Sequence, residues 1–312
     1  MDYDPEDAGF FARPQPPGEA TIRTGEGEME QLNSSGRFKV AVVGDFMEDV
    51  YWIGEAQSLS AEVPIPVVKV KERKIFPGGA GNVAANLAAL GVHCMWFGNG
   101  GPQKNRLMVG DHQLARWDEY DECRPAMGLD RLQDDFDAIV VSDYGKGSIT
   151  DHTISCIRVF RDLPIFVDTK RDPSVWSGVA TAIFPNAKEL DAHMESYVGF
   201  NGIVVRKMGA GGLALYPKGL RYFGETTNPD REICSSSQAR FIRSVNGAGD
   251  SVLAAFVYAY LRAGEKDSIM SDCPYKWEHI LGFANAAAAC AVEHPYTYAP
   301  TLEEVPERYA GF

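Results

Sequence analysis

The chain has 312 residues, 45% of them hydrophobic, and a formal net charge of −13 at pH 7. A chain of this size and composition can bury the core of one sizeable domain with a small appended lid. The acidic balance argues against broad electrostatic attraction to nucleic acid or to anionic membranes. A negatively charged substrate would therefore have to be held by a few local groups.

Other global features favour a cytoplasmic protein. The six cysteines include no C-x-x-C pair, which argues against a zinc site or a disulfide framework and suits a reducing compartment. No apolar run reaches the roughly 18 residues of a membrane span, and the N-terminus lacks a charged-then-apolar export pattern. Residues 1–36 are rich in Glu, Asp, Gly and Pro and are expected to form a flexible acidic tail, with a partner-binding arm as the alternative.

From residue 37 onward, short apolar runs alternate with helix-like segments. This alternation predicts an α/β fold with a doubly wound, mainly parallel sheet. Near-continuous apolar runs are typical of strands covered on both faces, and they occur at residues 38–43, 138–141, 164–168, 182–184 and 202–205. Ligands in such folds bind at the carboxyl ends of the strands. Asp45, Asp143, Asp168 and Asn186 fall at those ends, so we expect them to lie close together.

Two further segments alternate apolar with polar residues. Residues 63–70 and 107–117 are expected to be half-exposed antiparallel strands. They predict a small antiparallel β lid over a substrate pocket, with lid strands near residues 52–75 and 105–120 of a single domain at 37–312. An ordinary surface hairpin is the alternative.

Two glycine-rich segments carry the chemistry. Residues 78–82 (GGAGN) precede a small-residue helix pattern, and residues 244–251 (SVNGAGDS) run into an apolar helix pattern at 252–261. Glycine lets backbone N–H groups approach a phosphate closely, and a helix N-terminus adds about half a positive charge. We interpret the second segment as an anion hole in which Asp250 accepts a proton from an attacking hydroxyl. A plain strand-to-helix turn is the structural alternative.

With these residues in view, the sequence resembles the ribokinase-like (PfkB) family of carbohydrate kinases. The resemblance covers residues 38–295 and rests on five segments in the family's order: residues 40–45 (VAVVGD), 77–84 (PGGAGNVA), 184–189 (FPNAKE), 205–212 (VRKMGAGG) and 246–250 (NGAGD). Within the family, the more particular segments resemble the kinases of D-glycero-D-manno-heptose 7-phosphate. These segments are residues 49–54, 59–70, 141–147 and 283–288.

The resemblance implies in-line phosphoryl transfer from ATP, with Mg²⁺, to a sugar hydroxyl. The implied catalytic residues are Gly247, Ala248 and Gly249, whose amides would bind the γ-phosphate, and Asp250 as the base. The implied substrate contacts are Asp45, Gly78, Gly79, Asn82, Arg116, Asp143 and Lys170. The implied nucleotide contacts are Asn186, Glu189, Lys207, Gly209, Gly212, Asn246 and Asn285, with Glu189 acting on Mg²⁺ through water.

For four of these residues a plain structural role stays open. Lys170 and Arg116 could be solvated surface charges, Asp143 part of a capped turn, and Asn285 a helix-packing side chain. The resemblance also implies small-molecule partners, a sugar phosphate and ATP, and a homodimer formed through the lid strands.

The chain departs from the family in several places. Ser244 stands where the family usually has Asp, and Asn246 where it usually has Thr. The segments between Asn82 and Asp143 and between Glu189 and residue 203 are shorter than usual, so a helix is expected to be missing from each. The polar segment 225–240 is expected to be a loop. Three hypotheses therefore stay open: a heptose-phosphate kinase, a kinase for another sugar or a nucleoside, and a shortened relative that binds ligand without turnover.

Overall fold

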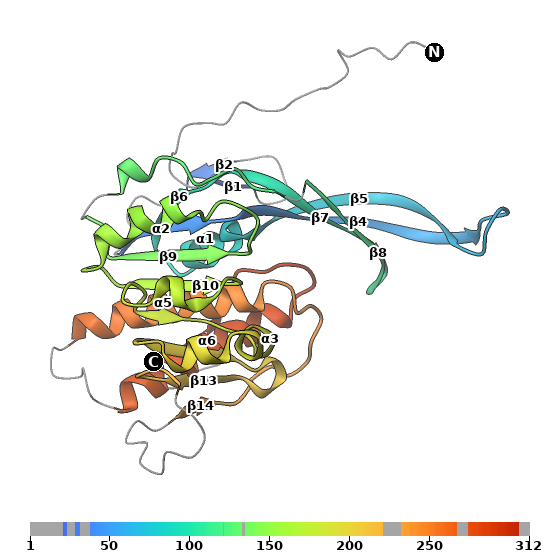
Figure 1. Cartoon of the computed structure of the whole chain (residues 1–312). Coiled ribbons are helices and arrows are strands. Elements are labelled where there is room, and N and C mark those ends of the chain that lie inside the picture. The colour runs from blue at the N-terminus through green and yellow to red at the C-terminus, as the bar shows by residue number, and fades with distance from the viewer. Residues whose placement is uncertain are drawn as a thin grey trace.

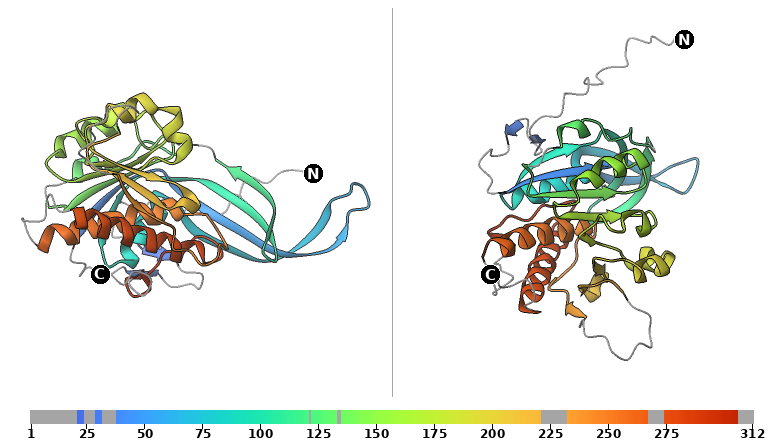
Figure 2. Two further views of the ribbon diagram at one scale, coloured as in Figure 1. Left: turned by 90° about the horizontal axis from the view of Figure 1, so that it is seen from below. Right: turned by 60° about the vertical axis from the view of Figure 1, so that its left-hand side comes forward.

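The computed structural model describes residues 21–23, 29–31, 38–120, 122–132, 135–220, 232–266 and 274–305. Its body is a sheet with helices on both faces, and a second sheet extends from one side of that body as a long projection (Figures 1 and 2). The two sheets meet where the candidate site residues gather.

The main sheet has the strand order β14-β13-β12-β11-β10-β9-β3-β6. The six strands from β12 to β6 are parallel, while β13 and β14 join one edge in antiparallel pairing. The bounds are β3 (Lys39–Gly44), β6 (His93–Phe97), β9 (Ala138–Asp143), β10 (Ile165–Thr169), β11 (Ala182–Ile183), β12 (Ile203–Lys207), β13 (Leu213–Tyr216) and β14 (Ile233–Ser235). The predicted mainly parallel sheet is confirmed. The expectation of a loop at 225–240 is wrong for β14, because its three residues complete the sheet edge beside β13, and residues 225–231 lie outside the described residues.

Successive residues of a central strand enter two different cores, as expected for a strand covered on both faces. Val40 and Val42 pack on the side of α1, α5 and α6, whereas Ala41 and Val43 pack on the side of α2, α3 and α4. The helices are α1 (Ala80–Ala89), α2 (Asp151–Ile157), α3 (Ala187–Ala192), α4 (Met194–Val198), α5 (Ala248–Lys266) and α6 (Pro274–Val292). Short 3₁₀ turns lie at Leu129–Arg131, Arg158–Phe160, Pro173–Trp176 and Gly209–Gly211.

The lid is a four-stranded sheet in the order β5-β4-β7-β8. Its strands are β4 (Phe46–Leu59), β5 (Pro66–Gly79), β7 (Gly100–Val109) and β8 (His112–Glu119). The predicted small antiparallel lid is confirmed in its two hairpins, since β4–β5 and β7–β8 are antiparallel, while the pairing of β4 with β7 between the hairpins is parallel. Of the strands predicted at 63–70 and 107–117, residues 66–70 lie in β5, residues 107–109 in β7 and residues 112–117 in β8, so the predicted bounds are wrong. Each range contains a turn or bend, at 61–64 and at 110–111, because alternation alone does not show where a strand reverses.

Both shortened segments are visible in the chain path. β6 ends at Phe97 and β7 begins at Gly100, so the chain passes from the main sheet to the lid with no helix between them. Between Glu189 and β12 the chain forms only the end of α3 and the five-residue α4. Within the predicted tail, the short strands β1 (Thr21–Arg23) and β2 (Met29–Gln31) pair antiparallel. The rest of that tail lies outside the described residues.

Candidate active site

A cavity of about 550 Å³ lies at the carboxyl ends of the parallel strands, bounded by the lid and by the N-terminal turn of α5. Most of the residues expected from the sequence line it: Gly79, Arg116, Asp143, Lys170, Asn186, Glu189, Lys207, Gly209, Gly212, Asn246, Gly247, Ala248, Gly249, Asp250 and Asn285. Asp45, Gly78 and Asn82 do not line it. Segments separated by as much as 200 positions in the chain thus meet in one place.

The turn before α5 requires glycine at position 247. Gly247 has φ +78°, a conformation that L side chains rarely adopt, and a Cβ atom there would lie 2.5 Å from Nδ2 of Asn82. α5 begins at the next residue, Ala248. The N–H groups of the first helical turn have no intrahelical acceptor and carry the positive end of the helix dipole, so this turn can bind an anion.

Asp250 lies in the first turn of α5 and is 4% exposed. Its Oδ2 accepts a hydrogen bond of 2.8 Å from Nδ2 of Asn82, and its Oδ1 accepts one of 2.8 Å from the hydroxyl of Tyr144. Burial raises the pKa of Asp250 to about 6, and these two hydrogen bonds limit the rise. At pH 7 the carboxylate is therefore mostly ionised and basic enough to accept a proton.

Asp45 holds the backbone that carries Tyr144. Its buried carboxylate accepts from the N–H groups of Tyr144 at 2.8 Å and Lys146 at 3.0 Å through Oδ2, and from Ser148 at 2.9 Å through Oδ1. In this structure Asp45 therefore shapes the loop after β9. Gly79, with φ +57°, continues into α1 and brings that helix, with Asn82, beside Asp250.

Asp143 is similarly engaged by its neighbours. Its carboxylate accepts from the N–H of Gly145 at 2.9 Å and from the hydroxyl of Thr169 at 2.8 Å, and it lies 3.1 Å from Nε of Arg171. Burial raises the pKa of Asp143, while these donors oppose the rise. The capped-turn interpretation of Asp143 thus has direct structural support, although the residue also lines the cavity.

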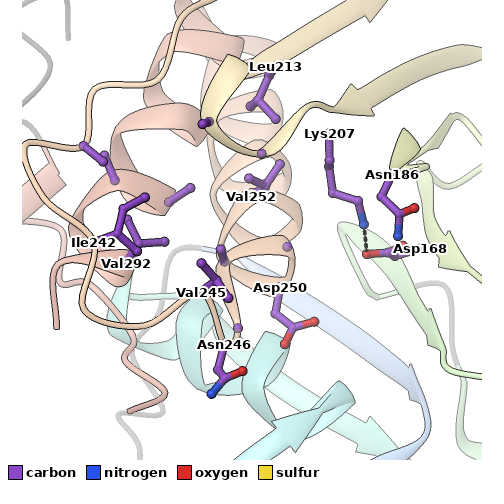
Figure 3. A pocket seen from close by; sticks show the side chains of 18 of the residues that line it. Asp168, Asn186, Lys207, Leu213, Ile242, Val245, Asn246, Asp250, Val252 and Val292 are labelled. Carbon is purple, nitrogen blue, oxygen red and sulfur yellow. Dashed lines mark hydrogen bonds and ion pairs between the residues drawn. The ribbon is translucent and has the colours of Figure 1, made fainter. Parts of the chain in front are cut away.

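The side of the cavity near α3 carries the predicted metal and phosphate residues. Asn186 and Glu189 form a reciprocal capping box at the start of α3, in which Oε2 of Glu189 accepts from the N–H of Asn186 at 2.8 Å. Burial raises the pKa of Glu189, and the positive charge of Lys207 opposes that rise. Lys207 itself pairs with Asp168 at 2.5 Å (Figure 3).

The far wall on this side is apolar. Ile242, Val245 and Val292 face the cavity across α5 from the Lys207–Asp168 pair (Figure 3). Nδ2 of Asn285 donates to the Ser235 hydroxyl at 3.0 Å and also to the backbone oxygen of Ser236, tying α6 to the segment after β14. Asn285 therefore has the helix-packing role that the sequence left open. The apolar cavity wall beside it is suited to a flat apolar ring.

The opposite end of the cavity is cationic, and it joins the predicted residues Lys170 and Arg116 with Lys104 and Tyr144, which sequence reasoning missed. Lys104 of β7 and Lys170, just after β10, each lie over the ring of Tyr144, at 4.9 and 4.8 Å from its centroid. Among the described residues, neither ammonium forms an ion pair with a carboxylate. Burial lowers the pKa of Lys104, and the charges of Lys170 and Arg116 lower it further. Arg116 also lines this end, but its guanidinium pairs with Asp118 at 2.7 Å.

A buried polar chain joins the anion-hole turn to the lid. Nδ2 of Asn246 donates to the hydroxyl of Tyr51 at 3.1 Å, and Thr297 lies 3.5 Å from that hydroxyl and 3.4 Å from Asp49. Asp49 in turn pairs with Arg106 at 2.6 Å. Asn246, which stands where Thr was expected, thus reaches a lid tyrosine. Its own N–H is 3.2 Å from the hydroxyl of Ser244, which stands where Asp was expected.

In the described part of the chain, no helix combines the length and apolar character needed to cross a membrane. The same residues contain no group of three or more His, Cys, Asp or Glu side chains arranged to hold a metal ion.

Comparisons with known proteins show which family the chain resembles. A model of the pfkB family carbohydrate kinases matches residues 150–304. The chain is 30% identical over 318 residues to the bifunctional protein HldE of Pseudomonas paraeruginosa, and 31% identical over 319 residues to that of Pseudomonas fluorescens. Each alignment covers 87% of this chain and 64% of the relative, so the chain spans less than two thirds of the length of these proteins.

Solved structures show the same fold. Phosphofructokinase-2 from Escherichia coli, in complex with substrates and products, superposes with a TM-score of 0.63 at 16% identity, covering 88% of this chain and 98% of that one. Ribokinase from Arabidopsis thaliana, complexed with ribose and ATP, gives 0.59 at 16% identity, covering 87% and 98%. Residues 150–304 therefore match the PfkB carbohydrate kinase family, and the chain as a whole has a ribokinase-like fold.

Proposed function

We propose that this protein transfers the γ-phosphoryl group of ATP to a hydroxyl of a phosphorylated sugar, a heptose 7-phosphate or a close analogue. The observation that carries the proposal is the placement of Asp250. Its buried carboxylate lies in the N-terminal turn of α5, in a cavity with an apolar wall at one end and, at the other, two lysines that have no carboxylate partner among the described residues. Such a site can hold a nucleotide and an anionic acceptor on either side of one base.

The chemistry requires little beyond positioning and charge neutralisation. The amides of Gly247, Ala248 and Gly249 would bind the anionic oxygens of the phosphoryl group in transfer. Asp250 would accept the proton of the attacking hydroxyl at a carboxylate oxygen. Lys207 is close enough to the turn that a Cβ on Gly249 would lie 3.6 Å from its Nζ, so its charge would favour the same phosphate.

The residues near α3 fit Mg²⁺ bound together with a nucleotide. Mg²⁺ prefers hard oxygen ligands and usually keeps several waters, with one or two carboxylates and the substrate phosphates completing its shell. Glu189 supplies a carboxylate to the cavity, and Asn186 holds one of its oxygens. We propose that Glu189 acts on the ion through water. The ion would neutralise charge on the phosphates.

The cationic end favours a phosphorylated acceptor over a nucleoside. A nucleoside pocket would be flanked by aromatic rings, whereas here Tyr144 is the aromatic residue of the described lining and Lys104, Lys170 and Arg116 accompany it. Two neighbouring ammonium groups without carboxylate partners repel each other, and a phosphate between them would relieve that repulsion. The resemblance to heptose 7-phosphate kinases in residues 141–147, which include Tyr144, agrees with this choice.

We also propose a homodimer formed through the lids. The end of β4, the bend after it and the start of β5 expose apolar side chains, namely Leu59, Val63, Ile65 and Val67. The hairpin projects well beyond the body (Figure 2). Exposed apolar patches of this kind mark interaction surfaces.

The test is ATP consumption across a panel of acceptors: heptose 7-phosphate, the unphosphorylated heptose, fructose 6-phosphate, ribose and adenosine. We expect turnover with the phosphorylated heptose, and a loss of about 10²- to 10⁴-fold in Asp250→Asn. Asp162→Asn, which changes an exposed surface aspartate, should match the wild type. Nucleotide binding without turnover for any acceptor would instead support the non-catalytic alternative.

The proposal that the cationic end binds the acceptor's phosphate can be tested with the same panel of acceptors. Lys104→Met with Lys170→Met should raise KM for the phosphorylated acceptor and leave KM for ATP unchanged. An equal effect on the phosphorylated and unphosphorylated heptose would show that these lysines do not bind the acceptor's phosphate.

A further inference from the structure

Tyr144 makes four separate contacts, one of them with Asp250. The motifs that carry the family resemblance assign it no role. Its N–H is held by Asp45 at 2.8 Å, and its hydroxyl donates to Oδ1 of Asp250 at 2.8 Å. Its ring lies within 5 Å of both Lys104 and Lys170. Desolvation raises the pKa of Tyr144 well above its ordinary value, so the hydroxyl stays protonated and remains a donor.

The two lysines would otherwise be natural partners for the base. The negative charge of Asp250 already acts on Lys104, where it opposes the fall in the pKa of that ammonium. Neither lysine has a carboxylate partner among the described residues. An ion pair between Asp250 and an ammonium would lower the basicity of the carboxylate and occupy the oxygen that must receive a proton.

We propose that Tyr144 is a positioning residue that keeps Asp250 available as the base: its hydroxyl orients the carboxylate, and its ring separates that carboxylate from the ammonium groups of Lys104 and Lys170. The lysines are thereby left for the phosphate of the acceptor. The kinetic consequences of this inference rest on the proposed function. The expected effect of Tyr144 on the pKa of Asp250 does not.

Other groups also face Asp250 and must be included. From α1, Asn82 donates to Oδ2. From β10, the negative charge of Asp168 raises the pKa of Asp250, and from β12 the positive charge of Lys207 lowers it. None of these contacts is made through Tyr144, so changes at position 144 should act on Asp250 through the hydroxyl, the ring and the two lysines.

Two substitutions separate the hydroxyl from the ring. Tyr144→Phe removes a donor to the charged carboxylate and keeps the ring. The pKa that limits kcat/KM on the acid side of its pH profile, the acid limb, should therefore rise by about one pH unit. Tyr144→Ala removes the ring as well and lets a lysine reach Asp250, so the limb should move below that of the wild type. Both variants should lower kcat by about 10-fold or more, because the base is no longer held in place.

A further variant identifies the lysines as the cause. Adding Lys104→Met and Lys170→Met to Tyr144→Ala should reverse the downward movement of the limb and bring it to or above the wild-type position. The matched control is Tyr298→Phe, because Tyr298 also donates to a carboxylate, that of Glu304 at 2.8 Å, but does not line the cavity. It should leave the pH profile unchanged.

A direct titration keeps the test independent of turnover. The carboxyl ¹³C resonance of Asp250, assigned by its loss in Asp250→Asn, should titrate near pH 6 in the wild type, higher in Tyr144→Phe and lower in Tyr144→Ala. Shifts in the same direction for both variants, or no shift in either, would overturn the inference. If the shifts occur but no acceptor is phosphorylated, the proposed function fails and the role of Tyr144 stands.

Discussion

Asn82 and Asp250 are 168 positions apart in the sequence, yet Nδ2 of Asn82 donates a hydrogen bond of 2.8 Å to Oδ2 of Asp250. Asn82 is the last residue of the first glycine-rich segment, 78–82, and Asp250 lies in the second, 244–251. The contact explains why Gly247 lacks a side chain, since a Cβ there would collide with the same amide. The two glycine-rich segments therefore act together to position the carboxylate of Asp250.

Asn82→Ala should raise the pKa of Asp250, because the carboxylate loses a hydrogen bond that favours its charged form. We expect the acid limb of kcat/KM to move up by about one pH unit and the rate at pH 7 to fall by about 10-fold. A pH–rate profile measures both. Asn99→Ala, which removes an amide that donates to the Pro125 carbonyl, is the control and should leave the limb in place.

Asp250→Asn should make the fold more stable at pH 7 to 8 while removing activity. Burial raises the folded-state pKa of Asp250 to about 6, above its ordinary value of 3.8, so the ionised form opposes folding above pH 6. The expected gain is about 1–3 kcal/mol at pH 7 to 8. It should shrink as the pH falls through 6 and vanish near pH 4. Urea unfolding at several pH values measures it, and a gain independent of pH would contradict this account.

Gly247→Ala should destabilise the protein by about 1–3 kcal/mol, because the backbone at φ +78° is strained for alanine and the new methyl group meets Asn82. Activity should fall with it, since the collision displaces the residue that holds Asp250. Gly264→Ala is the matched control within α5: nothing lies within 4 Å of a Cβ at that position. It should stabilise the helix by about 0.5–1 kcal/mol. Thermal unfolding of the two variants should therefore change in opposite directions.

Val67→Lys should weaken self-association if the lids pair between two copies, because a charge would be buried in an apolar contact. Val67 is 49% exposed on β5. Sedimentation or light scattering at several protein concentrations would report the change. Val159→Lys, which changes a body residue that is 75% exposed, should leave the association state as it is. A wild-type chain that is monomeric at all concentrations would rule out the proposed dimer.

Local pattern predicted much of the fold. The apolar runs at 38–43 and 138–141 became β3 and β9, because a strand buried on both faces must be apolar at every position. Alternation identified the lid but not its turns or the parallel pairing of β4 with β7, since strand direction depends on how distant segments meet. The site residues found from the sequence lie in glycine-rich segments or at the ends of apolar strands, because both features can be recognised in the sequence.

The same logic explains what was missed. Lys104 and Tyr144 carry no local signal that distinguishes them from a solvated lysine or a core tyrosine. Asp45 was expected to contact a sugar, yet its carboxylate accepts hydrogen bonds from three backbone N–H groups of the loop after β9. A side chain's partner is a property of the packed chain, so no spacing along the sequence could have revealed these contacts.

By itself the sequence determined the buried central strands, the two glycine-rich turns, and the place of Asp250 in the first turn of a helix that follows the second of them. Only the tertiary structure decided that Tyr144 contacts that carboxylate and also two lysines, one on β7 and one just after β10. Backbone conformation and burial pattern follow from neighbouring residues, whereas the charges that surround a buried group come from segments that meet only when the two sheets pack together.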